Sequence, residues 1–175
     1  MAVDCEFNQE FDPNHMYQYV NNEISVMHCH HYATLFTRLA MDMDKIGGTR
    51  FLRESMEESS YLTLQRIFLA QQIKGKEDRK KVAEQYFGLS GLGQIALTIG
   101  SSGGSAEMRH SHVDEGWVKK WKKEDRPVNF MGQGYILAAF CIINGRPVGS
   151  YQIVETRSIV KGDGKSEFTI TEKAR

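Results

Sequence analysis

The sequence predicts an α+β fold in which an antiparallel sheet is covered by helices on one face. Helix-type hydrophobic spacing dominates residues 29–88, whereas a hairpin, two helices and a closing hairpin are indicated after residue 93. Elements grouped in this way are typical of α+β proteins and not of doubly wound parallel sheets. A chain of 175 residues can bury one substantial core, so we expect a single domain over residues 1–175.

Three helices are predicted in the first half. An amphipathic helix over residues 29–44 is indicated by apolar residues at spacings of three and four: Tyr32, Leu35, Phe36, Leu39 and Met43. A helix over 49–73 carries a stripe expected to face the core: Phe51, Leu52, Met56, Leu62, Leu64, Ile67, Phe68 and Ile73. A third, over 76–88, turns Val82, Tyr86 and Phe87 inward. Residues 1–14 are expected to be a mobile start or a late-bound strand, and 15–27 a short strand or irregular segment.

The second half is predicted to pair strands around two helices. Residues 94–99 and 105–113 form a hairpin, followed by a short helix over 114–123 that Ser111 or Asp114 caps. A buried helix covers 130–143. Strands over 150–160 and 165–171 close the chain, joined by the turn sequence KGDG, which is a strong hairpin signal.

Composition limits the class of protein. Lys plus Arg and Asp plus Glu both number 22, and this balance argues against a nucleic-acid-binding face. The absence of net charge removes repulsion between copies, which favours a homodimer. The longest apolar run, nine residues ending at Ile143, is too short for a membrane span, which needs about 20 residues. Three cysteines without a CxxC pair predict a reduced, cytoplasmic protein without disulfides.

Histidines are concentrated in two short stretches, residues 27–32 and 109–112. If the first stretch opens a helix, His28 and His31 share a face, whereas in a strand His28 and His30 do. The second stretch is expected to be a strand, which points two further imidazoles the same way. Zinc, iron, nickel and copper all accept imidazole. The candidate metal ligands are therefore His28, His30, His31, His110 and His112.

Other groups near the histidines could take part in chemistry. Asp114 or Glu115 could add a carboxylate ligand, and a Cys29 thiolate would favour zinc or iron. As catalytic candidates, Glu115 would be a general base and Cys29 a nucleophile activated by a neighbouring imidazole. No HExxH or zinc-finger spacing is present, so structural histidines or a metal-free polar pocket stay open as alternatives.

Aromatic residues mark a possible apolar pocket. Core packing is the ordinary role of such side chains, but the same zone could line a cavity for a small molecule. The candidate ligand-binding residues are Tyr32, Trp117, Phe130 and Tyr135.

The stretch from Ser111 to Thr171 resembles the C-terminal half of the 4-vinyl-reductase-type domain, a predicted hydrocarbon-binding domain. Gly134, Gly162, Asp163 and Phe168 match its pattern of an apolar helix, a strand, a Gly-Asp turn and a final strand. The resemblance implies a ligand-binding α+β fold, commonly dimeric, that holds a small apolar or tetrapyrrole-like molecule. Cysteines that the family often carries beside the turn are replaced here by Arg157 or Ser158 and by Ser166.

Two functions follow from these observations. The first is binding of a small apolar or aromatic molecule in a pocket whose polar end is the histidine cluster, with or without a divalent metal such as zinc or iron. The alternative is a metal-dependent enzyme, of hydrolase, lyase or oxidoreductase type, that uses His28, His31, His110 and His112. A purely structural adaptor is a third hypothesis. The sequence leaves open whether the protein is an enzyme.

Overall fold

The computed structural model describes residues 6–26 and 29–174, and it confirms the α+β class. Its strands and helices, in chain order, are β1 (Gln9–Asp12), β2 (Tyr17–Val20), β3 (Glu23–Ser25), α1 (His30–Asp42), α2 (Gly48–Ala70), α3 (Lys76–Leu89), β4 (Gly93–Ile99), β5 (Gly103–Ser111), α4 (His112–Trp121), α5 (Phe130–Ile143), β6 (Tyr151–Arg157) and β7 (Ser166–Glu172). Short 3-10 helices occupy Asp44–Ile46 and Ile159–Lys161.

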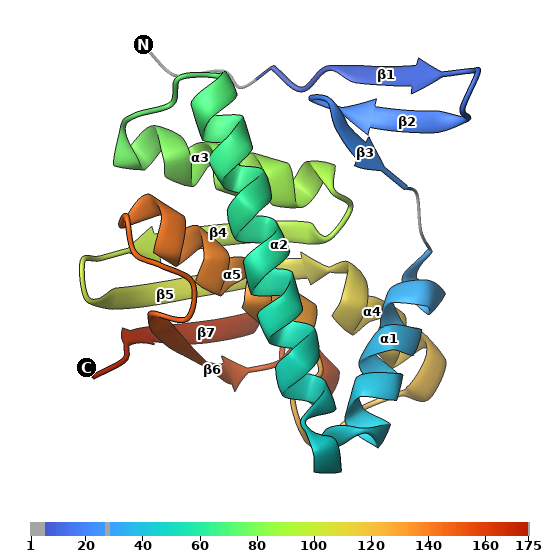
Figure 1. Ribbon diagram of the computed structural model, residues 1–175. Coiled ribbons are helices and arrows are strands. Elements are labelled where there is room, and N and C mark those ends of the chain that lie inside the picture. The colour runs from blue at the N-terminus through green and yellow to red at the C-terminus, as the bar shows by residue number, and fades with distance from the viewer. Residues whose placement is uncertain (1–5, 27–28, 175) are drawn as a thin grey trace.

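The main sheet has the order β4-β5-β7-β6, and all its neighbouring strands are antiparallel. Period-two alternation places Ala106 opposite Phe168 and Ile153 opposite Ile170 on the inner face. Helix α5 lies against this face, and α2 crosses over α5 on the side away from the sheet (Figure 1). Helix α3 covers the β4 edge, so the helices occupy one face, as predicted.

The crossing of α2 and α5 depends on a glycine. Residues Gly132 to Ile143 of α5 are all buried, so this helix has no wet face. At Gly134 a Cβ atom would lie 2.3 Å from the Arg53 carbonyl oxygen and 2.8 Å from the Met56 Cβ. The two helix backbones therefore approach so closely that position 134 has room for the hydrogen atom of glycine but not for a methyl group.

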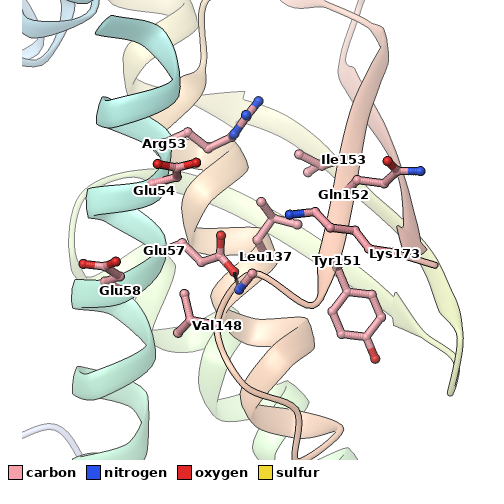
Figure 2. Close-up of a pocket in the computed structure, with 11 residues that line it drawn as sticks. Arg53, Glu54, Glu57, Glu58, Leu137, Val148, Tyr151, Gln152, Ile153 and Lys173 are labelled. Atoms are coloured by element: carbon pink, nitrogen blue, oxygen red, sulfur yellow. Dashed lines mark hydrogen bonds between the residues drawn. The ribbon is translucent and has the colours of Figure 1, made fainter. Parts of the chain in front are cut away.

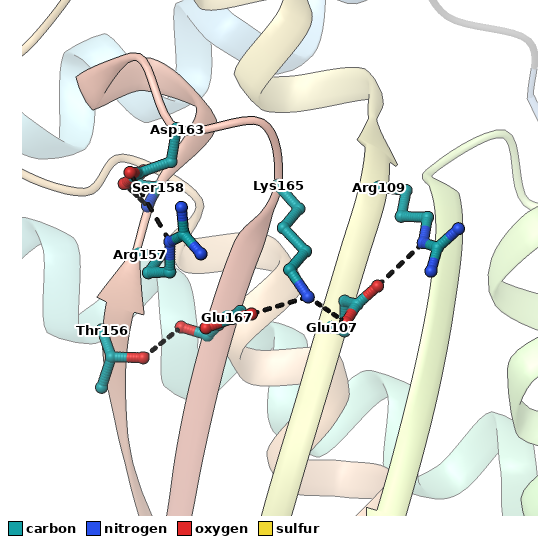
Figure 3. A network of polar contacts seen from close by, with 8 residues as sticks. All are labelled: Glu107, Arg109, Thr156, Arg157, Ser158, Asp163, Lys165 and Glu167. Atoms are coloured by element: carbon teal, nitrogen blue, oxygen red, sulfur yellow. Dashed lines mark hydrogen bonds and ion pairs between the residues drawn. The ribbon is translucent and has the colours of Figure 1, made fainter.

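The outer face of the sheet is charged and open to solvent. Lys165 Nζ lies 2.5 Å from Glu107 Oε2 and 2.7 Å from Glu167 Oε1, across neighbouring strands (Figure 3). Arg109 Nε lies 2.8 Å from Glu107 Oε1. Exposed ion pairs of this kind contribute at most about 1 kcal/mol each, so the network identifies a solvated surface more than a source of stability.

The described part of the N-terminal region forms a small sheet of order β1-β2-β3, which agrees with the strand alternatives predicted there and not with the mobile or irregular ones. An ion pair joins Glu23 of β3 to Arg66 of α2, and Gln71 Nε2 donates a hydrogen bond to the Glu6 carbonyl oxygen. These contacts hold the small sheet over one end of the helical layer (Figure 1).

Helix α1 is rotated so that the apolar face predicted to be buried points outward. Its buried face carries small residues, Ala33, Thr34, Thr37 and Ala40, and packs on α4. At Gly116 of α4 a Cβ would lie 2.7 Å from the His30 Cβ, so the contact requires small side chains on both helices. Met41 is buried in a cluster with Trp117, whereas the other large apolar residues of α1 face outward. On α2, Phe51 and Leu62 were expected in the core and are likewise exposed.

Two predicted boundaries are wrong by a few residues. Strand β6 ends at Arg157 because a 3-10 turn follows, which Gly162 closes with a left-handed φ of 102°. Helix α4 begins at His112 because the Ser111 hydroxyl accepts a hydrogen bond from the Asp114 amide and caps it. His112 is therefore helical, whereas a strand was predicted at this position. No helix in the described ranges is both long and apolar enough to span a membrane.

Candidate functional site

Two adjoining cavities lie between the small N-terminal sheet and the helical layer. The first has a volume of about 250 Å³, opens to solvent and is lined by residues of α2, α3, α5 and the β3 segment. Its lining consists of Ile24, Ser25, Val26, Met56, Ser59, Ser60, Thr63, Tyr86, Ser90, Leu92, Met131 and Tyr135. The second, of about 400 Å³, shares Ser25, Val26 and Ser90 with the first and has His112 in its wall.

The wall of the first cavity is neutral and mainly apolar, with hydroxyl groups between the apolar side chains. The Tyr135 hydroxyl donates a hydrogen bond to the Ala83 carbonyl oxygen at 2.6 Å, which fixes its ring as part of the wall. Burial raises the pKa of Tyr135 well above its usual value, so this residue stays uncharged. None of the residues around the first cavity is ionised at neutral pH, which suits an uncharged ligand.

The two histidine stretches meet where α1 and α4 begin. The ring centroids of His30 and His112 are 5.6 Å apart, and those of His30 and His31 are 5.0 Å apart. His110 does not point the same way as His112, contrary to expectation, because the chain changes from strand to helix between them. His110 instead lies exposed, with Nδ1 3.2 Å from Glu115 Oε1.

The expected metal and catalytic groups are distributed as follows. Within residues 6–26 and 29–174, no group of three or more His, Cys, Asp or Glu side chains is arranged to hold a metal ion. His28 lies outside the described residues. Cys29 occupies the N-cap position of α1 and is exposed, and Glu115 is an exposed residue of the first turn of α4.

Of the four aromatic residues expected to bind a ligand, Tyr135 lines the first cavity. Trp117 is fully buried in a separate hydrophobic cluster with Met41, Val128 and Val160, and Phe130 packs against that cluster. Tyr32 lies on the outward face of α1.

A buried polar cluster is close to the cavities in sequence. Its members Ser111, Asp114 and Asn129 lie within two residues of His112 or Met131, which line the cavity walls. Asn129 Nδ2 donates hydrogen bonds to Ser111 Oγ at 2.8 Å and to Asp114 Oδ2 at 3.1 Å. Asn129 Oδ1 accepts from the Gly132 amide at 2.8 Å and thereby caps α5. Ser166 Oγ donates to Asp114 Oδ2 at 3.3 Å. One of the positions where the family carries cysteine is therefore part of a hydroxyl and carboxyl network here.

Two carboxyl groups of this region have raised pKa values. Burial raises the pKa of Asp114 to about 6, against hydrogen bonds from Ser111, Asn129 and Ser166 that lower it. Burial and then the negative charge of Asp114 raise the pKa of Glu155 to about 7. Each group is thus partly protonated near neutral pH, chiefly because burial disfavours its charged form; the charge of Glu115 adds to the rise at Asp114, as that of Asp114 does at Glu155.

Stability should therefore fall as pH rises through this range. Above about pH 4.5 the unfolded chain releases both protons, whereas the folded chain retains them until the pH reaches about 6 at Asp114 and about 7 at Glu155, which makes the slope of unfolding free energy with pH negative. We expect a loss of roughly 3 kcal/mol between pH 4.5 and pH 7.5, in urea unfolding monitored by circular dichroism. Asp114→Asn should remove much of this slope, and a stability that rises with pH in the native protein would contradict the assignment.

A third cavity, of about 310 Å³, lies on the other side of α2 (Figure 2). Glu57 lies buried in its floor, where Oε1 accepts hydrogen bonds from the Gly149 amide at 2.8 Å and from Cys141 Sγ at 3.6 Å. Burial, and then the Glu57 charge, raises the pKa of Cys141 to about 12, so this thiol is unreactive. Arg53, Glu54, Glu58 and Lys173 complete a strongly ionic lining that does not suit an uncharged molecule.

The residues that enclose the first cavity were mostly not identified from the sequence. Met56 and Tyr86 had been assigned to the inward faces of two separate helices. That both line one cavity follows only from the packing of α2, α3 and α5. Ser60 and Ser90 carry no motif at all. The usable signals were the aromatic-rich zone, which supplied Tyr135, and the richness in methionine, since flexible thioether side chains are frequent in adaptable binding surfaces.

Comparison with known proteins gives a fold but no family. No family model matches the chain, and no curated protein matches it. Among solved structures, the chain is similar to the phenol-responsive sensory domain of the transcription activator PoxR, determined with phenol. The TM-score is 0.75 at 10% sequence identity, over 94% of this chain and 84% of that chain. The chain therefore has the fold of that sensory domain.

Proposed function

We propose that this protein binds a small, uncharged aromatic molecule in the cavity between α2, α3 and α5. The observation that carries the proposal is the pocket itself, which opens to solvent and whose wall is uncharged, with apolar side chains and hydroxyl groups side by side. A cavity of roughly 150 Å³ is enough to hold benzene, so about 250 Å³ accommodates one substituted ring. The likeness to a domain that binds phenol supports the same class of ligand.

The polar end of the site would be formed where the two cavities join. Ser90 belongs to both walls, and His112 lies in the second one. A ring in the first cavity would direct a hydroxyl group toward this junction, where imidazole and serine offer both hydrogen-bond donors and acceptors. An uncharged phenol thus matches the chemistry better than a carboxylate, for which no cation is present among the lining residues.

The proposal predicts that filling the cavity abolishes binding. Met131 is a half-buried lining residue of α5, and Met131→Trp would place an indole ring in the space meant for the ligand. We expect the native protein to bind phenol with a measurable heat in isothermal titration and the variant to bind at least tenfold more weakly. Leu69→Trp, at an exposed position of α2, is the matched control and should bind like the native protein.

A second candidate is a divalent metal ion, zinc or iron, held at the start of α1 and α4. An imidazole centroid lies about 3 Å from a bound ion, so two rings on one tetrahedral ion are about 5 Å apart. The spacings of 5.0 and 5.6 Å around His30 favour this candidate. With a bound ion, the histidines would form the polar end of the ligand pocket. Alternatively, they would form the active site of a metal-dependent enzyme.

Metal analysis tests this candidate directly. If it is right, untagged protein should contain close to one equivalent of metal by mass spectrometry, and His30→Ala/His112→Ala should lose it. His15→Ala is the control, because the His15 ring contacts Asp12, the last residue of β1, and is not in contact with the other histidines that the structure describes. Native protein that stays free of metal after reconstitution with zinc and iron would eliminate the candidate and leave the ligand proposal intact.

A further inference from the structure

A buried carboxyl group in the third cavity has no cation beside it. We call this cavity, of about 310 Å³ between α2 and β6, the ionic cavity. Glu57 in its floor is 3% exposed, and Oε1 accepts the hydrogen bonds from Gly149 and Cys141. Among the residues that the structure describes, no donor contacts Oε2, and no cationic side chain lies within ion-pair distance of the carboxyl group. Since buried carboxylates are almost always paired, Glu57 lacks a positive partner that the cavity could admit.

Two cationic side chains of the ionic cavity are also unpaired. Arg53 of α2 and Lys173, directly after β7, extend into the space between α2 and β6 (Figure 2). Neither has a carboxylate within ion-pair distance in the described ranges. Arg53 stands four positions before Glu57, a spacing at which ion pairs form on a helix, yet the carboxyl group bonds to Gly149 instead. The cavity therefore holds opposite charges that do not neutralise each other by contact.

The other two acidic residues of the lining are placed differently. Glu54 Oε1 lies 3.9 Å from Arg50 Nε, which provides it with a cation on the same helix. Glu58 is exposed and points away from the other lining residues (Figure 2). The groups left to bind a ligand are thus one buried carboxylate and two cations.

The size and the remaining wall of the cavity limit what such a ligand can be. Leu137 of α5 and Ile153 of β6 add apolar surface beside the charged groups. A volume of about 310 Å³ lies at the lower end of the range for small-molecule sites, which is roughly 300–1,000 Å³. A fitting ligand needs a cationic group for the carboxylate, an anionic group for the two cations and a compact apolar body. An α-amino acid with an apolar side chain has these three parts.

We propose that the ionic cavity binds a zwitterionic α-amino acid with an apolar side chain. Glu57 binds the ammonium group. Arg53 binds the carboxylate, both of whose oxygens a guanidinium group can contact at once, and Lys173 adds a second positive charge. This site shares no lining residue with the cavity proposed for the aromatic ligand and lies on the other side of α2, so the two proposals stand independently.

Ligands that lack one charge provide the first test. Isothermal titration of native protein with L-valine, L-leucine and L-phenylalanine covers three side-chain sizes, and we expect at least one to bind with a micromolar dissociation constant. The matching amine and acid each retain the side chain and one charged group; for leucine these are isoamylamine and isocaproate. Both should bind at least about tenfold more weakly than the amino acid, because each leaves one set of charges in the cavity without a partner.

Variants of the two charged sets provide the second test. Arg53→Gln/Lys173→Met removes both cations. Glu57→Gln removes the negative charge but keeps an oxygen that can accept the hydrogen bond from the Gly149 amide. We expect each variant to bind the amino acid at least about tenfold more weakly than native protein and to bind phenol with native affinity.

Arg38→Gln/Lys119→Met is the matched control, since it makes the same two replacements at exposed positions outside the cavity, and it should bind the amino acid like native protein. The proposal is overturned if native protein binds none of the three amino acids, if the amine and the acid bind as tightly as the zwitterion, or if the control loses as much affinity as the cavity variants. Should Glu57→Gln be unfolded by circular dichroism, the single-charge ligands and the double variant still decide. Loss of phenol binding alone would count against the aromatic site and not against this one.

Discussion

Replacing Asn129 by alanine is expected to lower the free energy of unfolding by about 3 kcal/mol. The side chain caps α5, which is worth about 1 kcal/mol, and its amide is a donor to the buried Asp114 carboxyl group. Removal of that donor leaves a buried carboxylate short of a partner, at a further cost of about 1–3 kcal/mol. For a chain of this length the melting temperature should fall by about 6–12 °C, which differential scanning calorimetry can measure.

Asn129→Asp separates the two contributions. An aspartate still caps a helix well, but it replaces the amide donor by a carboxylate facing Asp114. If the cluster matters as described, this variant should be strongly destabilised at pH 7.5 and recover part of its stability at pH 5, where the carboxyl pair is protonated. A variant as stable as the native protein at pH 7.5 would mean that only the cap contributes.

Replacing Gly134 by alanine is the second change with a large expected effect, again about 3 kcal/mol of lost stability. In an isolated helix the substitution would be favourable by up to about 1 kcal/mol. Here the new methyl group would lie 2.3 Å from the Arg53 carbonyl oxygen and 3.0 Å from the Glu57 amide nitrogen, both backbone atoms of α2. Because a helix backbone cannot yield locally, α2 and α5 must move apart, and the overpacking cost exceeds the gain.

Gly164→Ala is the control for this prediction. A Cβ at Gly164 meets no atom within 4 Å, so alanine should change the unfolding free energy by less than about 0.5 kcal/mol. Urea unfolding of both variants measures the difference. Equal stabilities of the two variants would show that the helix crossing is looser than the structure indicates. Since α2 and α5 also enclose the cavity, Gly134→Ala should weaken phenol binding as well.

The elements of this fold were largely predictable because each depends on local signals. The buried helix over Phe130–Ile143 agrees with the structure to the residue, since a continuous apolar run ends at a turn sequence, Asn144–Gly145. The hairpin of β4 and β5 follows from a glycine-rich turn between strand-type segments. These features require no knowledge of what lies beside them.

The orientation of α1 was not predictable, because the pattern of a helix shows that it has an apolar face but not what covers that face. Large residues such as Phe36 and Leu39 would normally be assigned to the core. The close contact of His30 and Thr34 with Gly116 reverses this, and it depends on two segments about 80 residues apart. A stripe that faces outward and a stripe buried within the chain give the same sequence signal.

The site was predictable in its parts but not in its arrangement. The approach of the two histidine stretches was anticipated, and the rings of His30 and His112 do lie close together. The strand predicted through His112 is wrong, because the Ser111 cap starts a helix at His112 and leaves His110 in the strand before it. The cavity wall comes from three helices and a short strand. The spacing of residues along the sequence does not indicate which residues of separate elements will line one cavity.

A crystal structure of the protein with 4-bromophenol tests the central claim most directly, because the anomalous signal of bromine locates the ligand without interpretation of weak density. The account predicts one strong peak inside the first cavity, between Met131 and Tyr86, with the hydroxyl group directed toward Ser90 and His112. Bromine found only on the surface or in the ionic cavity beside Glu57, or absent at saturating ligand, would contradict it.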